Sequence, residues 1–199
     1  LILTKNLQFG YFETEELKDV YKFKNIGKNV RISKAANIVG SENISLGNNI
    51  RIDNFTNIIC KNGYINIGDH NHVASGCFIL GTGGVEMGDF VGLAMGVQLI
   101  SSSDNYDGST LTNPMVGIEN SKPYTKKIIL GDHNLIGTNT VILPGAKIGE
   151  GVSVGALTLV KTDQKLLDWY VYFGIPAKKL KKRKKDLLFL AENFKKGLK

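Results

Sequence analysis

The sequence predicts an all-β solenoid in which short parallel strands coil around a shared axis. Two observations carry this prediction: an aliphatic residue stands at every sixth position from Leu130 to Val160, and a small residue, usually glycine, follows many of them. A period of six fits neither an α-helix nor a long strand, but it suits a short strand plus a turn with one side chain per repeat directed at the axis. One such unit cannot bury its apolar residue alone, so stacked units must supply the core.

Length and composition agree with a single soluble domain. The 199 residues are enough for one sizeable core, and the 42% hydrophobic and 22% charged fractions are ordinary for a globular protein. The opening Leu-Ile-Leu-Thr-Lys is too brief an apolar start for a signal peptide, and no apolar run approaches a membrane span, so we expect a cytoplasmic protein. In that compartment Cys60 and Cys77 are expected to be free buried thiols.

The net charge of +7 is concentrated at one end of the chain. Residues 161–199 hold 12 Lys and Arg against 4 Asp and Glu, so the rest of the sequence is close to neutral. A body without excess positive charge offers no basic groove, which argues against nucleic acid as a partner.

Residues 1–25 do not keep the six-residue period. The stretch from Glu13 to Tyr21 is expected to form a short helix, with Thr14 as its N-cap and acidic residues in the first turn. We expect this N-terminal segment to cap the open end of the solenoid, which would otherwise expose strand edges.

The repeated body is expected over residues 26–165. Its period restarts about every 20 residues at an aliphatic residue followed by glycine and polar turn formers, in the segments IGKN, LGNN, IGDH, MGDF, LGDH and IGEG. Three six-residue repeats between restarts imply a triangular coil with three short strands. Six such coils, at a strand spacing of roughly 4.8 Å, give a prism on the order of 29 Å long.

One long insertion and a basic tail interrupt or follow the repeat. Residues 100–129 are rich in Ser, Asn, Asp, Gly and Pro, and a long loop inside a compact repeat is usually functional. Residues 166–199 end in a predicted amphipathic helix with a basic face. Packing of this helix on the prism or on a neighbouring subunit is favoured over contact with a membrane surface. Its apolar stripe comprises Leu180, Leu187, Ala191, Phe194 and Leu198.

The repeats in register, together with GDHNLIGTNTVILPGAKIGEG, VGALTLVKTD and FGIPAKKLKKR, resemble the hexapeptide-repeat acyltransferases, in particular the galactoside, maltose and xenobiotic acetyltransferase branch. The resemblance covers about residues 26–185. It implies a left-handed parallel β-helix, which the spacing alone does not indicate, a homotrimer with active sites between subunits, and acetyl-CoA as the acyl donor, with no metal.

The resemblance also assigns a donor site. Positions that line the pantetheine arm in this family fall on Leu135, Gly137, Gly155 and Ala156, and positions near the CoA phosphates fall on Lys161, Lys178 and Arg183. Glycine lets an amide-bearing arm approach the backbone, and cations suit phosphates. As alternatives, the glycines serve turns and the lysines solvate a face. Leu135 also departs from the tryptophan that is common at its position.

The catalytic position departs more seriously from the family. The usual histidine, in a stretch such as T-x-T-H at the start of the long loop, is replaced by Ser101-Ser102-Ser103-Asp104. Acyl transfer to a hydroxyl needs a group that takes the acceptor's proton, and histidine suits this task near neutral pH. We rank His72 first and His133 second as the base, and we expect Asp104 to orient a histidine, bind a sugar hydroxyl or act as the base itself. Acceptor-binding candidates on the loop are Asn105, Tyr106, Asp107 and Asn113.

These features lead to a main hypothesis and two alternatives. The main hypothesis is an acetyl-CoA-dependent O-acetyltransferase that acts on a sugar hydroxyl in bacterial surface-polysaccharide synthesis. The first alternative is N-acetylation of a nucleotide-linked amino sugar. The second is a zinc enzyme of the carbonic anhydrase type, which would need three histidines across a subunit interface and fits the spacing of His70, His72 and His133 poorly.

Overall fold

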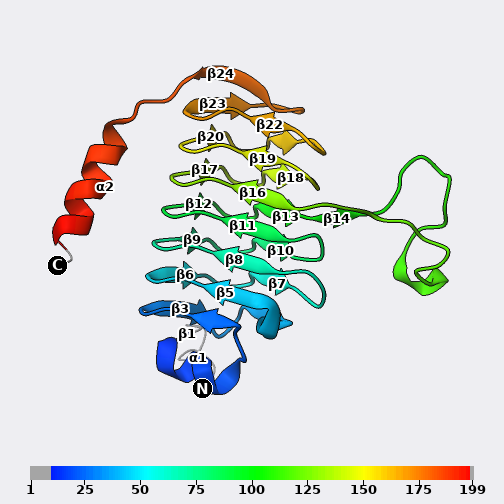
Figure 1. The fold of residues 1–199 in the computed structure, drawn as a ribbon, viewed down its shortest axis with the longest axis horizontal. Helices are drawn as coiled ribbons and strands as arrows, with labels where there is room; N and C mark the ends of the chain where they lie inside the picture. The colour runs from blue at the N-terminus through cyan, green and yellow to red at the C-terminus, as the bar shows by residue number, and fades with distance from the viewer. Residues whose placement is uncertain (1–9, 198–199) are drawn as a thin grey trace, which may run out of the picture.

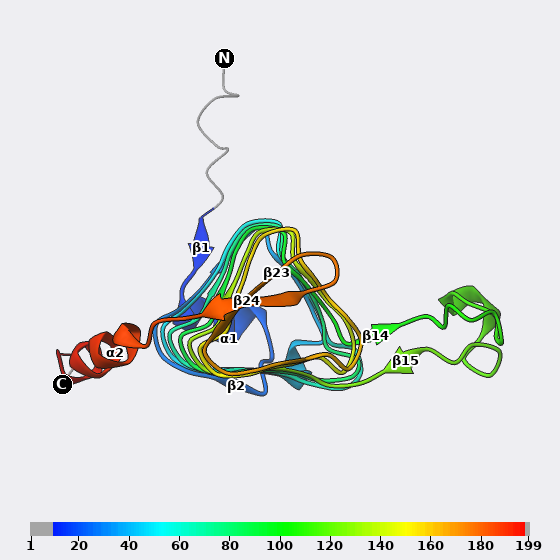
Figure 2. The same cartoon turned by 90° about the horizontal axis from the view of Figure 1, so that it is seen from above.

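The chain folds as a three-sided prism of stacked coils (Figures 1 and 2). The computed structural model describes residues 10–197. Six complete coils and a partial seventh give three parallel sheets, each of which takes one strand from each coil in turn. The expected triangular coil is confirmed. The stack is longer than the six coils expected, because a further turn begins at Lys165, at the expected end of the repeated body.

Sheet A contains β3 (Val30–Ser33), β6 (Ile50–Ile52), β9 (His72–Val73), β12 (Gly92–Leu93), β17 (Leu135–Ile136), β20 (Ser153–Val154) and β23 (Tyr170–Phe173). Antiparallel strands β1 (Tyr11–Phe12) and β24 (Lys178–Lys182) form its two edges. Sheet B contains β2 (Asn25–Ile26), β5 (Ile44–Leu46), β8 (Ile65–Ile67), β11 (Val85–Met87), β16 (Ile128–Leu130), β19 (Lys147–Ile148) and β22 (Lys165–Leu166). Sheet C contains β4 (Asn37–Val39), β7 (Asn57–Ile59), β10 (Phe78–Leu80), β13 (Gln98–Ile100), β18 (Val141–Ile142) and β21 (Leu159–Val160). A 3-10 turn, η1 (Ser41–Asn43), joins the first two coils.

The core fills the axis of the prism with inward side chains from the stacked strands, one or two from each. On sheet A, for example, Ile52, Val73, Leu93 and Ile136 are stacked in register and almost fully buried. Burying one such side chain contributes roughly 1.5–3 kcal/mol, and the contribution recurs at every strand. The two cysteines are buried free thiols, as expected from the sequence.

A ladder of carboxylates and amides runs along the corner between sheets B and A. At most coils the side-chain oxygen of the corner residue accepts the backbone N–H of the equivalent residue one coil earlier. Asn48 accepts from Lys28 at 2.9 Å, Asp69 from Asn48 at 2.7 Å, and Asp89 from Asp69 at 2.8 Å. The glycine before each acid leaves room for the next carboxylate: a Cβ on Gly68 would lie 2.5 Å from Asp89 Oδ1. The repeated GD and GN pairs therefore form this ladder.

The N-terminal end is closed by helix α1 (Thr14–Val20), whose Leu17 is fully buried against the first coil (Figure 1). The expectation that Thr14 is the N-cap was wrong. Glu13 is the N-cap, and its N–H donates to the Glu16 carboxylate at 2.9 Å. The Thr14 hydroxyl instead accepts the N–H of Val30 at 2.8 Å and donates to the same residue's carbonyl, which ties the helix to the prism.

After the last coil, β24 turns back along β23 and leads to helix α2 (Asp186–Gly197), which lies beside the coils (Figure 1). Of the expected apolar stripe, Leu187 and Ala191 are half-buried and Phe194 packs edge-on against His70, at 5.3 Å between ring centroids. Leu180 lies in β24 and not in the helix, and Leu198 lies outside the described residues. Within residues 10–197 no helix is long and apolar enough to cross a membrane.

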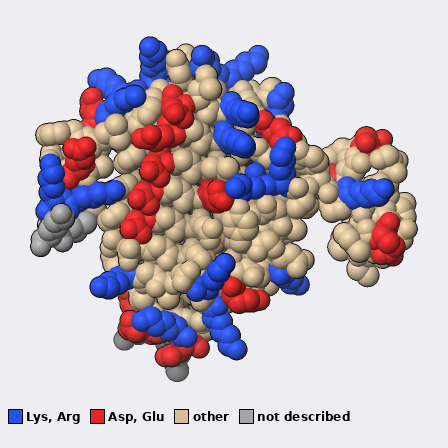
Figure 3. Space-filling model, viewed as in Figure 1, with Lys and Arg blue, Asp and Glu red and all other residues tan. Residues whose placement is uncertain are grey.

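The basic helix faces an acidic part of the prism. Figure 3 shows a band of acidic side chains along the coils beside basic side chains. Lys195 Nζ lies 3.9 Å from Asp89 Oδ2, and its ammonium also stands over the Phe90 ring at 5.0 Å from the centroid. Part of the tail's positive charge is therefore directed at the carboxylate ladder of its own chain.

The long loop forms an arm that projects from the prism (Figures 1 and 2). Its base is a short antiparallel pair, β14 (Ser102–Ser103) with β15 (Tyr124–Thr125), and its outer part holds the 3-10 turn η2 (Pro114–Val116). Asp163 fixes the returning strand, because it accepts a hydrogen bond from the Tyr124 hydroxyl and pairs with Lys126 at 2.7 Å.

Candidate functional site

The outward face of sheet A carries one row of side chains, one from each coil. The strand register places Arg51, His72, Gly92 and Leu135 next to one another in this row. Each alternates with a buried core residue, because neighbouring side chains of a strand point to opposite faces. The row therefore runs from charged residues in the early coils to an apolar residue in the fifth.

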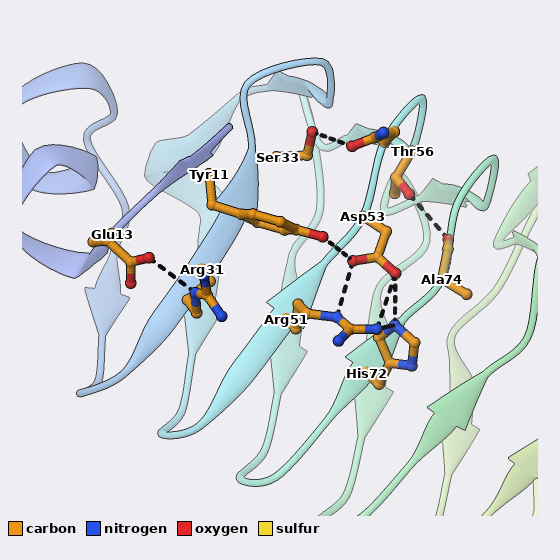
Figure 4. A network of polar contacts seen from close by, with 10 residues as sticks. Tyr11, Glu13, Arg31, Ser33, Arg51, Asp53, Thr56, His72 and Ala74 are labelled. Atoms are coloured by element: carbon orange, nitrogen blue, oxygen red, sulfur yellow. Dashed lines mark hydrogen bonds and ion pairs between the residues drawn. The ribbon is translucent and has the colours of Figure 1, made fainter. Parts of the chain in front are cut away.

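His72 belongs to a polar network at the early end of this row (Figure 4). Its Nε2 lies 2.8 Å from Asp53 Oδ2 and 2.9 Å from Arg51 Nη2. The Tyr11 hydroxyl donates to Asp53 Oδ1 at 2.7 Å, and Arg51 Nε lies 3.0 Å from the same oxygen. Burial tends to raise the pKa of Asp53, but hydrogen bonds from His72 and Tyr11 and the charges of His72 and Arg51 outweigh it and hold that pKa below its usual value.

The network allows His72 two neutral tautomers. When Nε2 carries the proton it donates to Asp53, and Nδ1 is left as an acceptor. When Nε2 is unprotonated it accepts from Arg51, and Nδ1 carries the proton. The histidine is thus held in place by Asp53 and Arg51 while its other nitrogen is available to a ligand. The His72 side chain is 42% exposed, so it is accessible.

A groove of small residues lies beside this row, near the corner between sheets A and C. Backbone hydrogen bonds place Ala74, Ala94, Gly137 and Gly155 at equivalent positions in successive coils. The early half of the groove opens into a cavity of about 330 Å³. This cavity, here called the groove cavity, is lined by His72, Ala74, Gly92, Leu93, Ala94, Met95, Leu135 and Thr138.

A second cavity, here called the arm pocket, lies where the arm leaves the prism. Its volume is about 340 Å³, and it is lined by Ser103, Asp104, Asn105, Tyr106, Tyr124, Leu143, Pro144 and Thr162. Asp104 is exposed at this pocket. The arm leaves the corner opposite sheet A (Figure 2). Asp104 directly follows β14 at the base of the arm and His72 lies on sheet A, so the two residues lie on different sides of one subunit.

Of the acceptor-binding candidates on the arm, some line the arm pocket and others do not. Tyr106 is 91% exposed and, with Asn105, lines the arm pocket. Asn105 and Asp107 accept backbone N–H groups two residues ahead, at 2.9 and 2.7 Å, so both also stabilise the turns of the arm. The hydrogen bonds from Ser109 lower the pKa of Asp107. Asn113 accepts from the N–H of Met115 at 3.0 Å, at the start of η2 and away from the pocket lining.

Four of the expected donor-site residues lie together. Leu135 lines the groove cavity, and Gly137, Gly155 and Ala156 follow in the later coils, where the coils are closely packed: a Cβ on Gly137 would lie 2.5 Å from the Ala156 nitrogen. Lys178 is exposed on β24 and pairs in register with Phe173, whose ring covers Gly155.

The other two cations lie elsewhere on the prism. Lys161 is exposed beside Thr162, at the corner that carries the arm. Arg183 donates through Nη1 to the carbonyls of His133 and Gly151, at 2.7 and 3.0 Å, on the corner between sheets B and A. Burial of this guanidinium lowers its pKa. The structure therefore does not bring Lys161, Lys178 and Arg183 to one place in a single chain.

His133 belongs to a stack of rings and lines neither the groove cavity nor the arm pocket. It lies parallel to Phe90, at 5.0 Å and 12°, and His70 stacks on the other face of that ring at 4.7 Å and 12°. No group of three or more His, Cys, Asp and Glu side chains among residues 10–197 is arranged to hold a metal ion.

Sequence reasoning missed Asp53, Arg51 and Tyr11, which hold His72. One signal for Asp53 was present: it is a carboxylate at the coil position where later coils have Ala74, Ala94, Gly137 and Gly155. A charged residue in a column of small ones indicates a specific partner. Tyr11 comes from the edge strand β1, and its partner could not be inferred without the fold.

Comparison with known proteins gives matches over nearly the whole chain. The model of the family "Bacterial transferase hexapeptide (six repeats)" matches residues 127–162. The dTDP-4-amino-4,6-dideoxy-D-glucose acyltransferase of Escherichia coli is 37% identical over 186 residues, which cover 94% of this chain and 95% of that protein. The two chains thus correspond from end to end.

Solved structures extend this likeness. AntD, an N-acyltransferase from Bacillus cereus in complex with dTDP and 3-hydroxybutyryl-CoA, aligns with a TM-score of 0.87 at 37% identity, covering 95% of this chain and 98% of that one. Other AntD structures carry substitutions at an aspartate and at a serine. A maltose O-acetyltransferase from Clostridium difficile 630 shares the fold, with a TM-score of 0.56 at 24% identity, covering 87% of this chain and 78% of that one.

The repeat, the sheet topology and the end-to-end matches lead to the same result. The hexapeptide repeat implies that the parallel β-helix is left-handed, and the similar AntD structures bind coenzyme A or an acyl-CoA. The chain belongs to the hexapeptide-repeat acyltransferases, enzymes that take their acyl group from coenzyme A.

Proposed function

We propose that this enzyme is an N-acyltransferase that moves an acyl group from a coenzyme A thioester to the amine of a nucleotide-linked amino sugar. This was the alternative to O-acetylation in the sequence analysis, and it is now the better-supported hypothesis. The observation that carries it is Asp104, a carboxylate in the arm pocket at the position where the O-acetylating branch has histidine.

The chemistry of the acceptor accounts for this replacement. A hydroxyl must lose its proton while it attacks, so it needs a good base such as histidine. An amine attacks the thioester carbonyl with its own lone pair. The C–N bond then forms, the C–S bond breaks, and the proton released by nitrogen passes to the departing thiolate. A carboxylate suffices to orient the amine and to accept its proton on the way.

Two relatives support an amino-sugar acceptor. The E. coli relative is named for dTDP-4-amino-4,6-dideoxy-D-glucose, and AntD has been solved with that compound and coenzyme A. In AntD the substituted serine precedes the substituted aspartate by the same separation that places Ala94 before Asp104 here. The match leaves few residues of either chain unpaired, so a residue of AntD and its counterpart in this chain have similar numbers. Asp104 is the one aspartate between Phe90 and Tyr106, so it is the counterpart that we propose for the AntD aspartate.

The groove beside sheet A is the proposed donor site. Gly137 and Gly155 are partly exposed and Ala156 is exposed, so the backbone here is accessible to the amide-bearing pantetheine arm. Lys178 stands at its late end and is our first candidate for the CoA phosphates. Arg183 stays a second candidate, since its Nη1 is already bound to two carbonyls. Tyr106 and Asn105 at the arm pocket are candidates for contact with the sugar or its nucleotide.

A complete site requires a second copy of the chain. Asp104 and the groove lie on different sides of one subunit, so the acceptor and donor halves cannot meet within it (Figure 2). We propose a homotrimer in which the arm of one subunit reaches sheet A of the next, consistent with the preference of homo-oligomers for cyclic symmetry. A nucleotide-linked acyl-amino sugar is a precursor for glycans, so surface-polysaccharide synthesis remains the proposed setting.

An acceptor panel tests the reaction. The purified protein is incubated with acetyl-CoA or 3-hydroxybutyryl-CoA and with dTDP-4-amino-4,6-dideoxyglucose, and thiol release and product mass are measured. A dTDP-hexose without an amine and a free galactoside or maltose serve as hydroxyl acceptors. We expect an amide product with the amino sugar and little thiol release with the others. Faster transfer to a hydroxyl acceptor would restore the O-acetylation hypothesis.

A further inference from the structure

The groove cavity has more room than an acetyl group needs, and one residue creates much of that room. In the outward row of sheet A, Gly92 stands between His72 and Leu135 where other coils carry a side chain such as Arg51 or Ser153. The missing side chain opens the cavity of about 330 Å³ between the histidine and the leucine.

The fold itself does not demand glycine at position 92. Its backbone is outside the left-handed region, and a Cβ there would meet Leu135 Cδ1 at 3.5 Å, an ordinary contact. Gly68, by contrast, would bring a Cβ to 2.5 Å from the next coil's carboxylate. A glycine inside a strand costs stability, because it lacks a side chain to pack and loses more conformational freedom. The open space at Gly92 is therefore better explained by a ligand than by packing.

The shape of the cavity suits the acyl end of the donor. Its lining is largely small or apolar and includes Ala74, Ala94, and Met95 and Leu135, which are 59% and 48% exposed. Towards the later coils it continues into the groove at Gly137, where the proposed function places the pantetheine arm. Towards the earlier coils it ends at His72. A thioester with its arm along the groove would direct its acyl chain towards His72.

We propose that the groove cavity holds the acyl group of the donor and that Gly92 sets its permitted length, so that butanoyl-sized groups are used in preference to acetyl. This inference rests on the proposed function, because it needs a coenzyme A thioester in the groove. AntD has been solved with 3-hydroxybutyryl-CoA, which shows that a related fold accommodates a group of this size.

The test compares donors and not only variants. Acetyl-, propionyl-, butyryl- and 3-hydroxybutyryl-CoA are used with one amino-sugar acceptor, and kcat/KM is determined for each. For the wild type we expect kcat/KM to rise from acetyl to butyryl. One methylene in an apolar pocket typically changes kcat/KM by about 10- to 200-fold.

Two variants change the cavity in opposite directions. Gly92→Val fills the space from the middle of the row and should lower kcat/KM for butyryl-CoA by about 10- to 200-fold more than for acetyl-CoA. Leu135→Ala widens the cavity and should shift the ratio towards the longer donors. Asn66→Val is the control, because Asn66 is an exposed, outward residue on a strand of sheet B and gains the same side chain away from the groove.

The outcomes separate this inference from the proposed function. If the wild type acylates the amino sugar but Gly92→Val lowers kcat/KM equally for all donors, the cavity does not select the acyl group and the inference is overturned. If Gly92→Val lowers kcat/KM equally for all donors and also changes the mass of the oligomer, a neighbouring subunit fills the cavity. That result also overturns the inference. If no thioester is used by the wild type, the proposed function fails first. A shifted donor ratio in Leu135→Ala supports the inference even where Gly92→Val folds poorly.

Discussion

At the scale of single residues, the active-site chemistry depends on where one carboxylate and one histidine lie. Asp104 lines the arm pocket, whereas His72 lies on sheet A with its Nε2 between Asp53 and Arg51. His72 is the first candidate for the base when the acceptor is a hydroxyl. An amine acceptor removes that requirement and gives Asp104 the larger role, with His72 at the end of the groove.

We expect Asp104→Asn to lower kcat for the amino-sugar acceptor by about 10²- to 10⁴-fold, the usual range for loss of a general base. The amide keeps the size of the side chain but neither accepts a proton nor carries charge. His72→Ala should reduce kcat much less, and His133→Ala should leave it close to the wild-type value. Steady-state kinetics with saturating donor measures all three. A dead His72→Ala beside an active Asp104→Asn would return the base to His72.

At the same scale, the Asp53 carboxylate predicts a pH effect on stability. Its pKa is lower in the folded protein than in the unfolded chain, so the folded state is favoured above the unfolded pKa and this contribution is lost as pH falls through the folded value. This contribution is measured by urea unfolding of the wild type and of Asp53→Asn at several pH values, from neutral to strongly acidic. The difference in unfolding free energy should shrink on acidification. If the difference stays constant with pH, the pKa of Asp53 does not change on folding.

At the scale of elements, the corner between sheets B and A shows how closely the coils are joined. Each acid of the ladder binds the preceding coil through the space that a glycine leaves. We expect Gly68→Ala to destabilise the protein by about 1–3 kcal/mol, because its Cβ would overlap Asp89 and the backbone of Gly88. Gly92→Ala is the matched control and should change stability by less than about 1 kcal/mol in either direction. The denaturant midpoints of the two variants are compared. Equal midpoints would contradict a role of the ladder in joining the coils.

The elements also show what sequence can and cannot predict. The period of six predicted the coils because an inward aliphatic residue recurs at that spacing from strand to strand, and restarts such as IGDH marked the corner where Asp69 and His70 lie. The seventh coil was missed since Trp169 and Tyr172 do not look like members of an aliphatic repeat, although both are buried. The site was harder to predict. His72 was named as a candidate, but its partners Asp53 and Tyr11 come from other coils and the edge strand, and such contacts depend on register across the stack.

At the scale of the whole molecule, the separation of Asp104 from the groove predicts activity only in an assembly. We expect light scattering to give the mass of a trimer. Subunits with Asp104→Asn should be inactive with butyryl-CoA, and so should subunits whose groove is blocked by Gly92→Trp. When the two variants are co-expressed and mix randomly in a cyclic trimer, roughly a quarter of the sites should combine an intact arm with an intact groove and regain activity. An active monomer, or no recovery in heterotrimers of verified composition, would contradict a shared site.

The last strand determines how the molecule ends. A parallel stack has no inherent limit, because the edge of each coil presents free N–H and C=O groups that can bind another coil. Here β24 runs antiparallel to β23 and carries four lysines in five residues. A second prism that approached this end would meet reversed backbone polarity and a row of like charges. The same KKLKK segment that adds to the basic tail thus covers the edge of sheet A, and we expect a chain shortened before Lys178 to expose β23 as a template for such growth.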